Sequence, residues 1–441
     1  MMMKRFAGCF FMLAILFSNA TPAQATTFED LLLSIKSETA ILIDGDTGQV
    51  LFEKEIHKKM SPASITKVMT GFLALENAEL DDLITISRDA IYSIERNSSH
   101  IALDTDEELT LENALYALAI TSANDAANGI AEHVGGTMEG FASLMNARAK
   151  EAGAIHTNFT NAHGLPDPDH YTTVYDMAMI TRAAIQTPHF AEIFSTRVYE
   201  MPPTNKQQEP RTFWRKSALI VGRNQYDGSI AEKTGYTTDA QHTFAAAAQR
   251  DGRTLIAVVM KSSGSKDKLE DTTALFDYGF SEFDSITFSA EEISKGVYAL
   301  IEADGMQAEA DIKGFTCLIP KALLKKDVEI DYVVEGGTAH EWSVKAVFSL
   351  PVSDETMAVT ELGALKMTAL LHPVVDDIVP VVASEPVSVA QDEIEQAEKA
   401  HFPILELALG VLGVLAVLYV YLCMRRYLIL ERRRRRRVRY R

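Results

Sequence analysis

The sequence predicts an α+β protein: a larger mixed domain at residues 27–281, a small β-rich domain at residues 285–372, and membrane-directed segments at both ends. Alternating apolar runs lie at both ends of the first domain, with helical periodicities between them. Strands at the two ends with helices between them are typical of an α+β fold. The second domain contains short alternating runs separated by glycine turns, at residues 296–312 and 327–350, which indicate strands.

The elements expected in the first domain follow from local patterns. Residues 38–55 alternate around an Asp-Gly/Thr-Gly turn, which predicts a β-hairpin. Residues 64–77 have a helical pattern, and residues 110–136 predict two helices with a break near the sequence TSAND. Further helices are expected at 138–152, 173–187 and 268–281, and a second hairpin at 242–262, closed at Asp251-Gly252.

Both ends of the chain carry membrane-directed patterns. Residues 1–25 combine a basic start, an apolar core and the sequence Ala-Gln-Ala, as a signal peptide does; a retained anchor helix is the alternative. Residues 403–424, which contain no charged residue from Leu407 onward, are long enough to cross a bilayer. The arginines of residues 425–441 predict a cytoplasmic tail, with the body of the chain outside. The acidic residues 373–402 predict a linker.

The charge and the cysteines exclude several classes of function. The formal net charge is −19 although the tail holds ten Arg and one Glu, so the body of the chain is strongly acidic and is not expected to bind nucleic acid. Cys9 lies in the signal segment and Cys423 in the expected span, which leaves Cys317 without a partner for a disulfide. No cofactor and no metal site are expected.

A serine and a lysine in the sequence SPASITKVMT could form a nucleophile with its base. Ser64 and Lys67 are three positions apart at the start of an expected helix, so their side chains share a face. A helix start favours negative charge on the serine oxygen, and a desolvated lysine can accept a proton. A helix cap followed by a surface lysine explains the same spacing. The spacing also occurs twice in the polar sequence SSGSKDK, residues 262–268, which is expected to be an exposed loop.

Two later segments supply further polar groups. Ser122 and Asn124 lie at the break between two expected helices, where they could face a cleft or simply cap a helix. Lys233, Thr234 and Gly235 form the sequence KTG on an expected strand. Alternation places Lys233 and Gly235 on one face and Thr234 on the other, unless the strand is an edge that lines a groove. The glycine would let a substrate backbone approach closely.

The ordered set S-x-x-K, S-x-N and K-T-G resembles the signature of penicillin-recognising serine enzymes. The segments SPASITKVMT, ITSANDAANGIAEHVGG, FTNAHGLPDPDHYTTVYDMAMI and KTGYTTDAQHTFAAAA resemble those of low-molecular-mass penicillin-binding proteins, the serine-type D-alanyl-D-alanine carboxypeptidases of the SxxK acyltransferases. The resemblance covers residues 27–281 and is much weaker afterwards. It implies a β-lactamase/transpeptidase-like domain, an antiparallel sheet flanked by helices with a helical subdomain.

The resemblance implies a catalytic role for three residues. Ser64 would attack the carbonyl of the penultimate D-alanine, and Lys67 would take its proton. Ser122 would pass protons toward the leaving amine, helped by Lys233. Asn124 would hydrogen-bond the substrate amide.

The remaining motif residues would bind the substrate. Thr234 and the charge of Lys233 would hold the terminal carboxylate, beside Gly235. The backbone N–H groups of Ser64 and Tyr236 would form the oxyanion hole.

The implied function is a DD-carboxypeptidase that trims peptidoglycan stem peptides ending in D-Ala-D-Ala and binds β-lactams covalently. It would act in cell-wall biogenesis and cell shape, anchored by a single C-terminal span with its catalytic domain on the periplasmic side of the inner membrane. Two alternatives remain: a DD-endopeptidase that cuts cross-links, and a catalytically silent, membrane-tethered peptidoglycan-binding protein. A β-lactamase is less favoured, because no clear E-x-x-x-N segment supplies a second base.

Two features depart from the family or invite another explanation. Glu232 precedes Lys233 where the family usually has Val or Ile, and the C-terminal segment resembles a spanning helix rather than an amphipathic one. His156, His163 and His170 recur every seven positions, but they lie in a stretch rich in Asn, Pro and Asp without an H-E-x-x-H pattern. We therefore expect a loop there, not a zinc site.

Overall fold

The computed structural model describes residues 27–373 except 217, 303–305, 339 and 351–360, all within one compact unit of the chain. The segments expected at 1–25, 403–424 and 425–441, and nearly all of the linker expected at 373–402, lie outside the described residues. Within the described part, none of the helices is both long and apolar enough to cross a bilayer.

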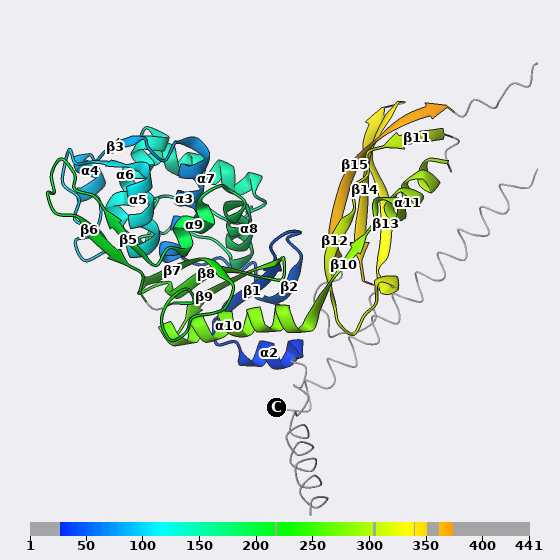
Figure 1. Cartoon of the computed structure of the whole chain (residues 1–441), viewed down its shortest axis with the longest axis horizontal. Helices are drawn as coiled ribbons and strands as arrows, with labels where there is room; N and C mark the ends of the chain where they lie inside the picture. The colour runs from blue at the N-terminus through cyan, green and yellow to red at the C-terminus, as the bar shows by residue number, and fades with distance from the viewer. Residues whose placement is uncertain (1–26, 217, 303–305, 339, 351–360, 374–441) are drawn as a thin grey trace, which may run out of the picture. The chain divides into compact units, whose positions relative to one another are not determined.

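A five-stranded antiparallel sheet, in the order β2-β1-β9-β8-β7, lies at the centre of residues 27–282 (Figure 1). Its strands are β1 (Thr39–Asp44), β2 (Val50–Lys54), β7 (Ser229–Thr237), β8 (Gln241–Arg250) and β9 (Arg253–Ser262). The β1–β2 and β8–β9 pairs confirm the two predicted hairpins. β1 also pairs with β9, so the two ends of this region join in one sheet, and β7 is left at the edge.

Apolar side chains cover both faces of the sheet. On β8, Ala245 belongs to the core under the helical layer, whereas Phe244 and Ala246 belong to the core beneath α2 (Phe28–Ser34) and α10 (Ser265–Glu282). This alternation follows the two-residue period of a strand. Figure 1 shows α2 and α10 on one side of the sheet and the other helices of this region on the opposite side.

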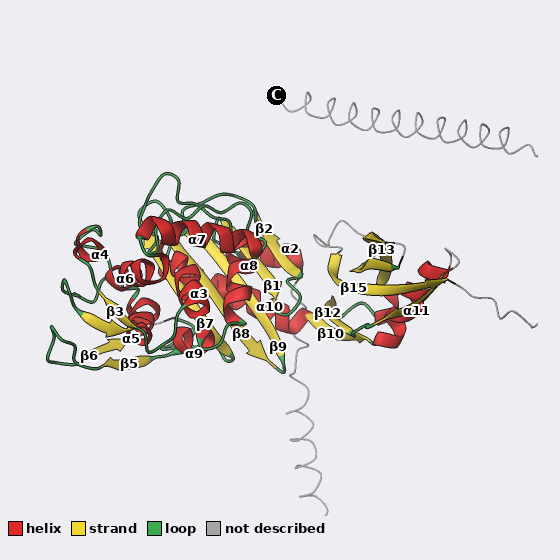
Figure 2. Cartoon of the chain, turned by 90° about the horizontal axis from the view of Figure 1, so that it is seen from above, coloured by secondary structure: helices red, strands yellow, loops and turns green. Residues whose placement is uncertain are grey.

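The helical layer surrounds α3 (Lys67–Asn77), whose first eight residues are all buried. α3 packs against α6, α7 and α8 (Figure 2). The layer consists of α4 (Arg88–Tyr92), α5 (Leu111–Tyr116), α6 (Asn124–Gly135), α7 (Met138–Glu151), α8 (Val174–Ile185) and α9 (Phe190–Ser195), bordered by two small two-stranded sheets, β3 (Leu83–Thr85)–β4 (Glu108–Thr110) and β5 (Val198–Met201)–β6 (Arg211–Trp214). These elements confirm the predicted helices and the break between α5 and α6.

The described part of residues 283–373 contains two small sheets, an α-helix and a short 3-10 turn, Lys325–Asp327. The elements are β10 (Phe283–Phe288), α11 (Ala290–Glu302), β11 (Met306–Ala310), β12 (Phe315–Pro320), β13 (Glu329–Thr338), β14 (Glu341–Ser349) and β15 (Glu361–Pro373). The prediction of alternating strands was wrong for Gly296–Glu302, which lies in α11. The buried residues Ile293, Val297 and Ile301 recur every four positions, and this spacing gives a helix one apolar face.

The prediction of an exposed loop at residues 262–268 was also wrong in part. Ser265 begins α10, and Ser265 and Lys266 are exposed, but Lys268 is buried. The Nζ of Lys268 lies 5.6 Å from the ring centroid of Phe244 on β8. The next residue, Leu269, belongs to the core between α10 and the sheet, so the inner face of the helix carries the lysine stem into that core.

Candidate functional site

The side chain of Lys67 is the centre of the site. It is fully buried, and its Nζ lies 3.1 Å from Oγ of Ser64, 2.7 Å from Oδ1 of Asn124 and 2.7 Å from the backbone carbonyl oxygen of His163. Burial lowers the pKa of Lys67 to about 7, opposed by the charge of Asp125. The amine can therefore be neutral near physiological pH.

The partners of Lys67 also orient its lone pair. A neutral amine has two N–H donors and one lone pair, and the oxygens of Asn124 and His163 can only accept hydrogen bonds. When both donors point to those two oxygens, the lone pair is left to face the hydroxyl of Ser64. The arrangement is that of a general base beside a nucleophile.

Ser64 lies in a single 3-10 turn, Ala63–Thr66, that leads directly into α3. The backbone of Ala63 has a positive φ of 51°, which bends the chain just before the serine. Gly235 of β7 comes so close that a Cβ there would lie 2.8 Å from the backbone nitrogen of Ser64. The serine amide is therefore held beside the edge strand.

Ser122 has a strained backbone, with φ 61° and ψ 35° in the left-handed region. It follows a π-helical segment, Ala117–Thr121, and is separated from α6 by one residue, Ala123. Its Oγ accepts a hydrogen bond from Nζ of Lys233 at 3.0 Å. Backbone strain of this kind is concentrated at functional sites, because the surrounding structure has to hold it in place.

Asn124 begins α6 and is buried, with its Oδ1 on Lys67. The next residue, Asp125, accepts hydrogen bonds from the backbone N–H groups of Ile101, Leu103 and Ala126. The carboxylate thereby ties the loop before β4 to the start of α6. Burial raises the pKa of Asp125, and the backbone hydrogen bonds oppose that shift.

Lys233 is buried, and its Nζ joins Ser122 to the backbone oxygen of Thr234, 2.8 Å away. Burial is the main cause that lowers the pKa of Lys233 well below its ordinary value. Repulsion from Lys67, Arg215 and Lys268 lowers this pKa further, and the charge of Glu232 raises it. Two lysines thus serve two ends of one site, one beside each serine.

The other residues of the KTG sequence lie on the edge strand β7. Lys233 and Gly235 face the side of Ser122 and Ser64, and the side chain of Thr234 has no hydrogen-bond partner within the described residues. Tyr236 is exposed, with its ring 4.7 Å from that of His242. Because β7 is an edge strand, its outer side is not paired with another strand of this sheet.

A family model described as D-alanyl-D-alanine carboxypeptidase matches residues 23–264, more than half of the chain and the whole of the site. The chain belongs to this family. The resemblance expected from the three motifs is thereby confirmed. Within the family, D-alanyl-D-alanine carboxypeptidase DacF of Bacillus subtilis is 31% identical over 286 residues, 61% of this chain and 70% of DacF.

Two solved structures extend the likeness of this carboxypeptidase family member to its fold. The DD-transpeptidase of Streptomyces K15 is 27% identical, with a TM-score of 0.52 over 56% of this chain and 97% of that one. Penicillin binding protein 6B of Escherichia coli is 22% identical and shows the fold alone, with a TM-score of 0.58 over 75% of this chain and 95% of that one. The chain has the transpeptidase/β-lactamase-like α+β fold.

The sequence motifs missed two groups of this site: the carbonyl oxygen of His163 and the carboxylate of Asp125. His163 lies in the loop of the sequence HGLPDPDH, which also brings Nε2 of His170 to 2.9 Å from Oγ1 of Thr66. Gly164 in this loop has a φ of 85°. The sequence predicted a loop here from its Asn, Pro and Asp content, but no motif shows which backbone oxygen the loop brings to Lys67.

The histidines do not form a metal site in the described part of the chain, where no group of three or more His, Cys, Asp or Glu is placed to hold an ion. Burial lowers the pKa of His163 to about 3 and that of His170 to about 4, so both rings are neutral at pH 7. Asp176 accepts hydrogen bonds from the backbone of His156 and from Thr157, and so fixes the loop geometry.

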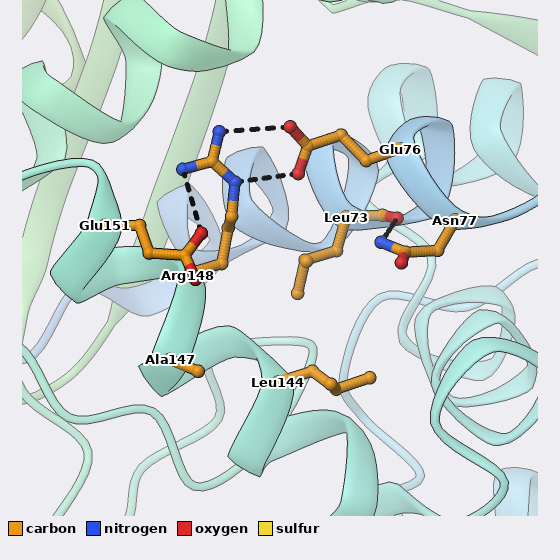
Figure 3. Close-up of a pocket in the computed structure, with 7 residues that line it drawn as sticks. All are labelled: Leu73, Glu76, Asn77, Leu144, Ala147, Arg148 and Glu151. Carbon is orange, nitrogen blue, oxygen red and sulfur yellow. Dashed lines mark hydrogen bonds and ion pairs between the residues drawn. The ribbon is translucent and has the colours of Figure 1, made fainter.

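A hollow on the surface between α3 and α7 is separate from this site. Figure 3 shows that Arg148 points across it toward Glu76 and Glu151. Arg148 donates to the Glu76 carboxylate at 2.8 and 3.0 Å, so the charges in the hollow already have partners. None of its lining residues belongs to the site around Ser64.

Proposed function

We propose that this family member is a serine-type DD-carboxypeptidase that removes the terminal D-alanine from peptidoglycan stem peptides. The reaction would pass through an acyl-enzyme on Ser64, and β-lactams would acylate the same oxygen. The observation that carries the proposal is the buried amine of Lys67, held by two acceptors with its Nζ 3.1 Å from Oγ of Ser64.

Acylation begins when Lys67 takes the hydroxyl proton of Ser64 and Oγ attacks the carbonyl carbon of the penultimate D-alanine. The N–H groups of Ser64 and Tyr236 would stabilise the oxyanion. As the C–N bond breaks, Ser122 gives its proton to the leaving amine and regains the proton that Lys67 took from Ser64, while Lys233 holds the Ser122 oxygen by its hydrogen bond. D-Alanine leaves, and water then hydrolyses the ester.

Substrate recognition would use the KTG strand and Asn124. The open edge of β7 can accept an extended peptide, and Gly235 leaves room for its backbone. Lys233 supplies a positive charge and Thr234 a free hydroxyl for the terminal carboxylate. Asn124 would use its amide nitrogen for the substrate amide while its oxygen stays on Lys67.

The test uses the full chain in detergent with a labelled penicillin and with a pentapeptide ending in D-Ala-D-Ala. We expect one label per chain and release of D-alanine, both lost in S64A. The matched control is S265A, which removes an exposed serine with the same spacing to a lysine and should keep both activities. Residual turnover in S64A would mean that the nucleophile is another residue.

The same assay separates the alternatives. Cleavage of added cross-linked dimers to monomers, without release of D-alanine from the pentapeptide, would make the protein a DD-endopeptidase. Absence of both labelling and release from the folded wild type would make it a silent binding protein.

We also propose that residues 403–424 anchor the protein in the cytoplasmic membrane with the catalytic region outside, after removal of residues 1–25. The uncharged stretch from Leu407 and the arginines that follow it support this orientation. Protease added to spheroplasts should digest the catalytic region and spare the C-terminal tail. Protection of the catalytic region would contradict the proposal.

A further inference from the structure

Glu232, which departs from the family pattern, is a buried carboxylate next to Lys233. Its side chain is 1% exposed. Its Oε2 accepts hydrogen bonds from the backbone N–H groups of Leu219 at 2.8 Å and Ile220 at 3.2 Å. Burial raises the pKa of Glu232, while the charge of Arg215 and these two amide donors oppose that shift and favour the ionised carboxylate.

Arg215 supplies the opposite charge, but without a direct hydrogen bond between the charged ends. Its Nη1 lies 3.7 Å from Oε1 of Glu232, and its Nε donates to the backbone oxygen of Thr196 at 2.9 Å. Oε1 of Glu232 and Nη2 of Arg215 have no hydrogen-bond partner among the described residues. The pairing is therefore incomplete, and the charge of Glu232 can act on its other neighbours.

Glu232 and Lys233 lie on opposite faces of β7. Glu232 pairs with Ala246, which belongs to the core beneath α10, and Lys233 pairs with Ala245, which belongs to the core under the helical layer. The carboxylate of Glu232 thus lies on the face of β7 opposite Lys233, whose side chain points into the site.

We propose that Glu232 is a positioning residue, which from the back of the sheet keeps Lys233 in the charged form that holds the terminal carboxylate of the substrate. The inference rests on the proposed function and adds a role to a residue outside the three motifs. Glu232 touches neither serine and acts only through its neighbour on the strand.

The charges around Lys233 show why such a residue is needed. Lys67 from α3, Lys268 from α10 and Arg215 from the segment after β6 all oppose a further positive charge. Burial lowers the pKa of Lys233 even more than they do, and Glu232 is the charged group on the described residues that raises it. Loss of the Glu232 charge should therefore let Lys233 lose its proton at lower pH.

The test compares wild type, E232Q and the control E53Q across pH. A glutamine at 232 can still accept both amide hydrogen bonds through its oxygen but carries no charge. We expect the alkaline limb of kcat/KM for a D-Ala-D-Ala peptide to move to lower pH by roughly half to one unit. E53Q changes a carboxyl on β2, the opposite edge of the same sheet, and should leave the limb in place.

A second readout separates this role from damage to the fold. On the alkaline side, KM for the peptide acid should rise roughly threefold to tenfold in E232Q with little change in kcat. The same peptide with a terminal amide has no carboxylate to lose, so its kcat/KM should not change. An equal loss for acid and amide would show a merely structural role and overturn the proposal.

If E232Q alone does not fold, the role of Glu232 is tested by comparing R215M with R215M/E232Q. The double variant removes both buried charges and so leaves no guanidinium without its counter-charge. Its alkaline limb should lie at lower pH than that of R215M, and coincidence of the two limbs would overturn the proposal. A wild type that neither binds penicillin nor releases D-alanine would instead refute the proposed function itself.

Discussion

The backbone of Gly164 packs directly against the carbonyl oxygen of Ala63, the residue before the nucleophile. A Cβ at Gly164 would overlap that oxygen and would also come within 2.8 Å of Oγ1 of Thr66. The loop that delivers the His163 carbonyl to Lys67 thus touches the turn that carries Ser64. This contact joins the base to the nucleophile through the backbone.

We predict that G164A disrupts this contact. The added methyl group must displace the turn before Ser64, and φ at this position is 85°, which disfavours alanine. We expect a loss of about 2–4 kcal/mol in the free energy of unfolding and a fall of at least about tenfold in the rate of acylation by a labelled penicillin. Urea denaturation and stopped-flow labelling measure the two effects.

The control is G153A. Gly153 has nearly the same φ, 86°, but a Cβ there meets nothing within 4 Å. It should lose only about 1 kcal/mol through backbone strain and acylate normally. Equal effects of the two variants would mean that the contact with Ala63 does not matter.

We predict that acylation of Ser64 depends on pH through Lys67. Burial lowers the pKa of Lys67 to about 7. Below that pH the amine is protonated and cannot accept the serine proton, so the rate should fall about tenfold per pH unit and level off above pH 7. The second-order rate of β-lactam acylation between pH 5 and 8 measures this limb.

A permanently charged side chain provides the matched variant. K67R should remain unreactive at every pH in that range, because a guanidinium does not lose its proton. A flat profile for the wild type between pH 5 and 7 would show that Lys67 is not the base.

How much of this site could be read from the sequence depends on how far apart its parts lie. Ser64 and Lys67 are three positions apart, so their spacing put their side chains on one face, but only the later motifs separated this pair from a helix cap with a surface lysine. Asn124 and the carbonyl of His163 contact the same amine from 57 and 96 positions away. The identity of Asn124 was part of a motif, but a backbone oxygen has no side chain that a motif could contain.

The two wrong predictions of structure have the same physical origin. The sequence SSGSKDK is polar, and polarity suggested exposure, yet the helical period carries Lys268 to the inner face of α10. Residues 296–302 were assigned by short alternation, whereas the four-residue spacing of Val297 and Ile301 gave the helix. Polarity misled in the first case and a short alternation in the second; in both, packing of a helix against a sheet decided the structure.

We predict that the ion pair between Glu107 and Arg211 stabilises the region beside the site. The Glu107 side chain is fully buried and accepts from Nη1 of Arg211 at 2.7 Å and from Nη2 at 3.2 Å. R211M would leave the carboxylate without its counter-charge, so we expect a loss of about 3–5 kcal/mol at pH 7. R148M, which breaks a partly exposed pair with Glu76, should cost about 1 kcal/mol or less.

The effect of R211M should depend on pH. Burial raises the pKa of Glu107, but hydrogen bonds from Arg211 and Thr204 outweigh it, and the folded-state pKa is lower than the ordinary value. Stabilisation by such a group is present above its unfolded pKa and is lost as the pH falls through its folded pKa. The difference in the free energy of unfolding between wild type and R211M, measured by urea denaturation, should therefore become smaller below about pH 4. A difference that stays constant with pH would show that the charge of Glu107 is not what R211M unpairs.

The last prediction separates strain from chemistry at Ser122. Its φ of 61° is costly for any residue but glycine, while its hydroxyl accepts from Lys233. S122A and S122G should both lose about 100-fold to 10,000-fold in turnover of a D-Ala-D-Ala peptide, because neither can pass a proton to the leaving amine. S122G should nevertheless be more stable than S122A by about 1 kcal/mol, since it relieves the strained backbone.

H189G, at an exposed residue with a similar φ of 66°, should gain stability without affecting turnover. If S122A kept its turnover, the proton would reach the amine by another route; if S122G were the less stable variant, the strain would be compensated within the turn.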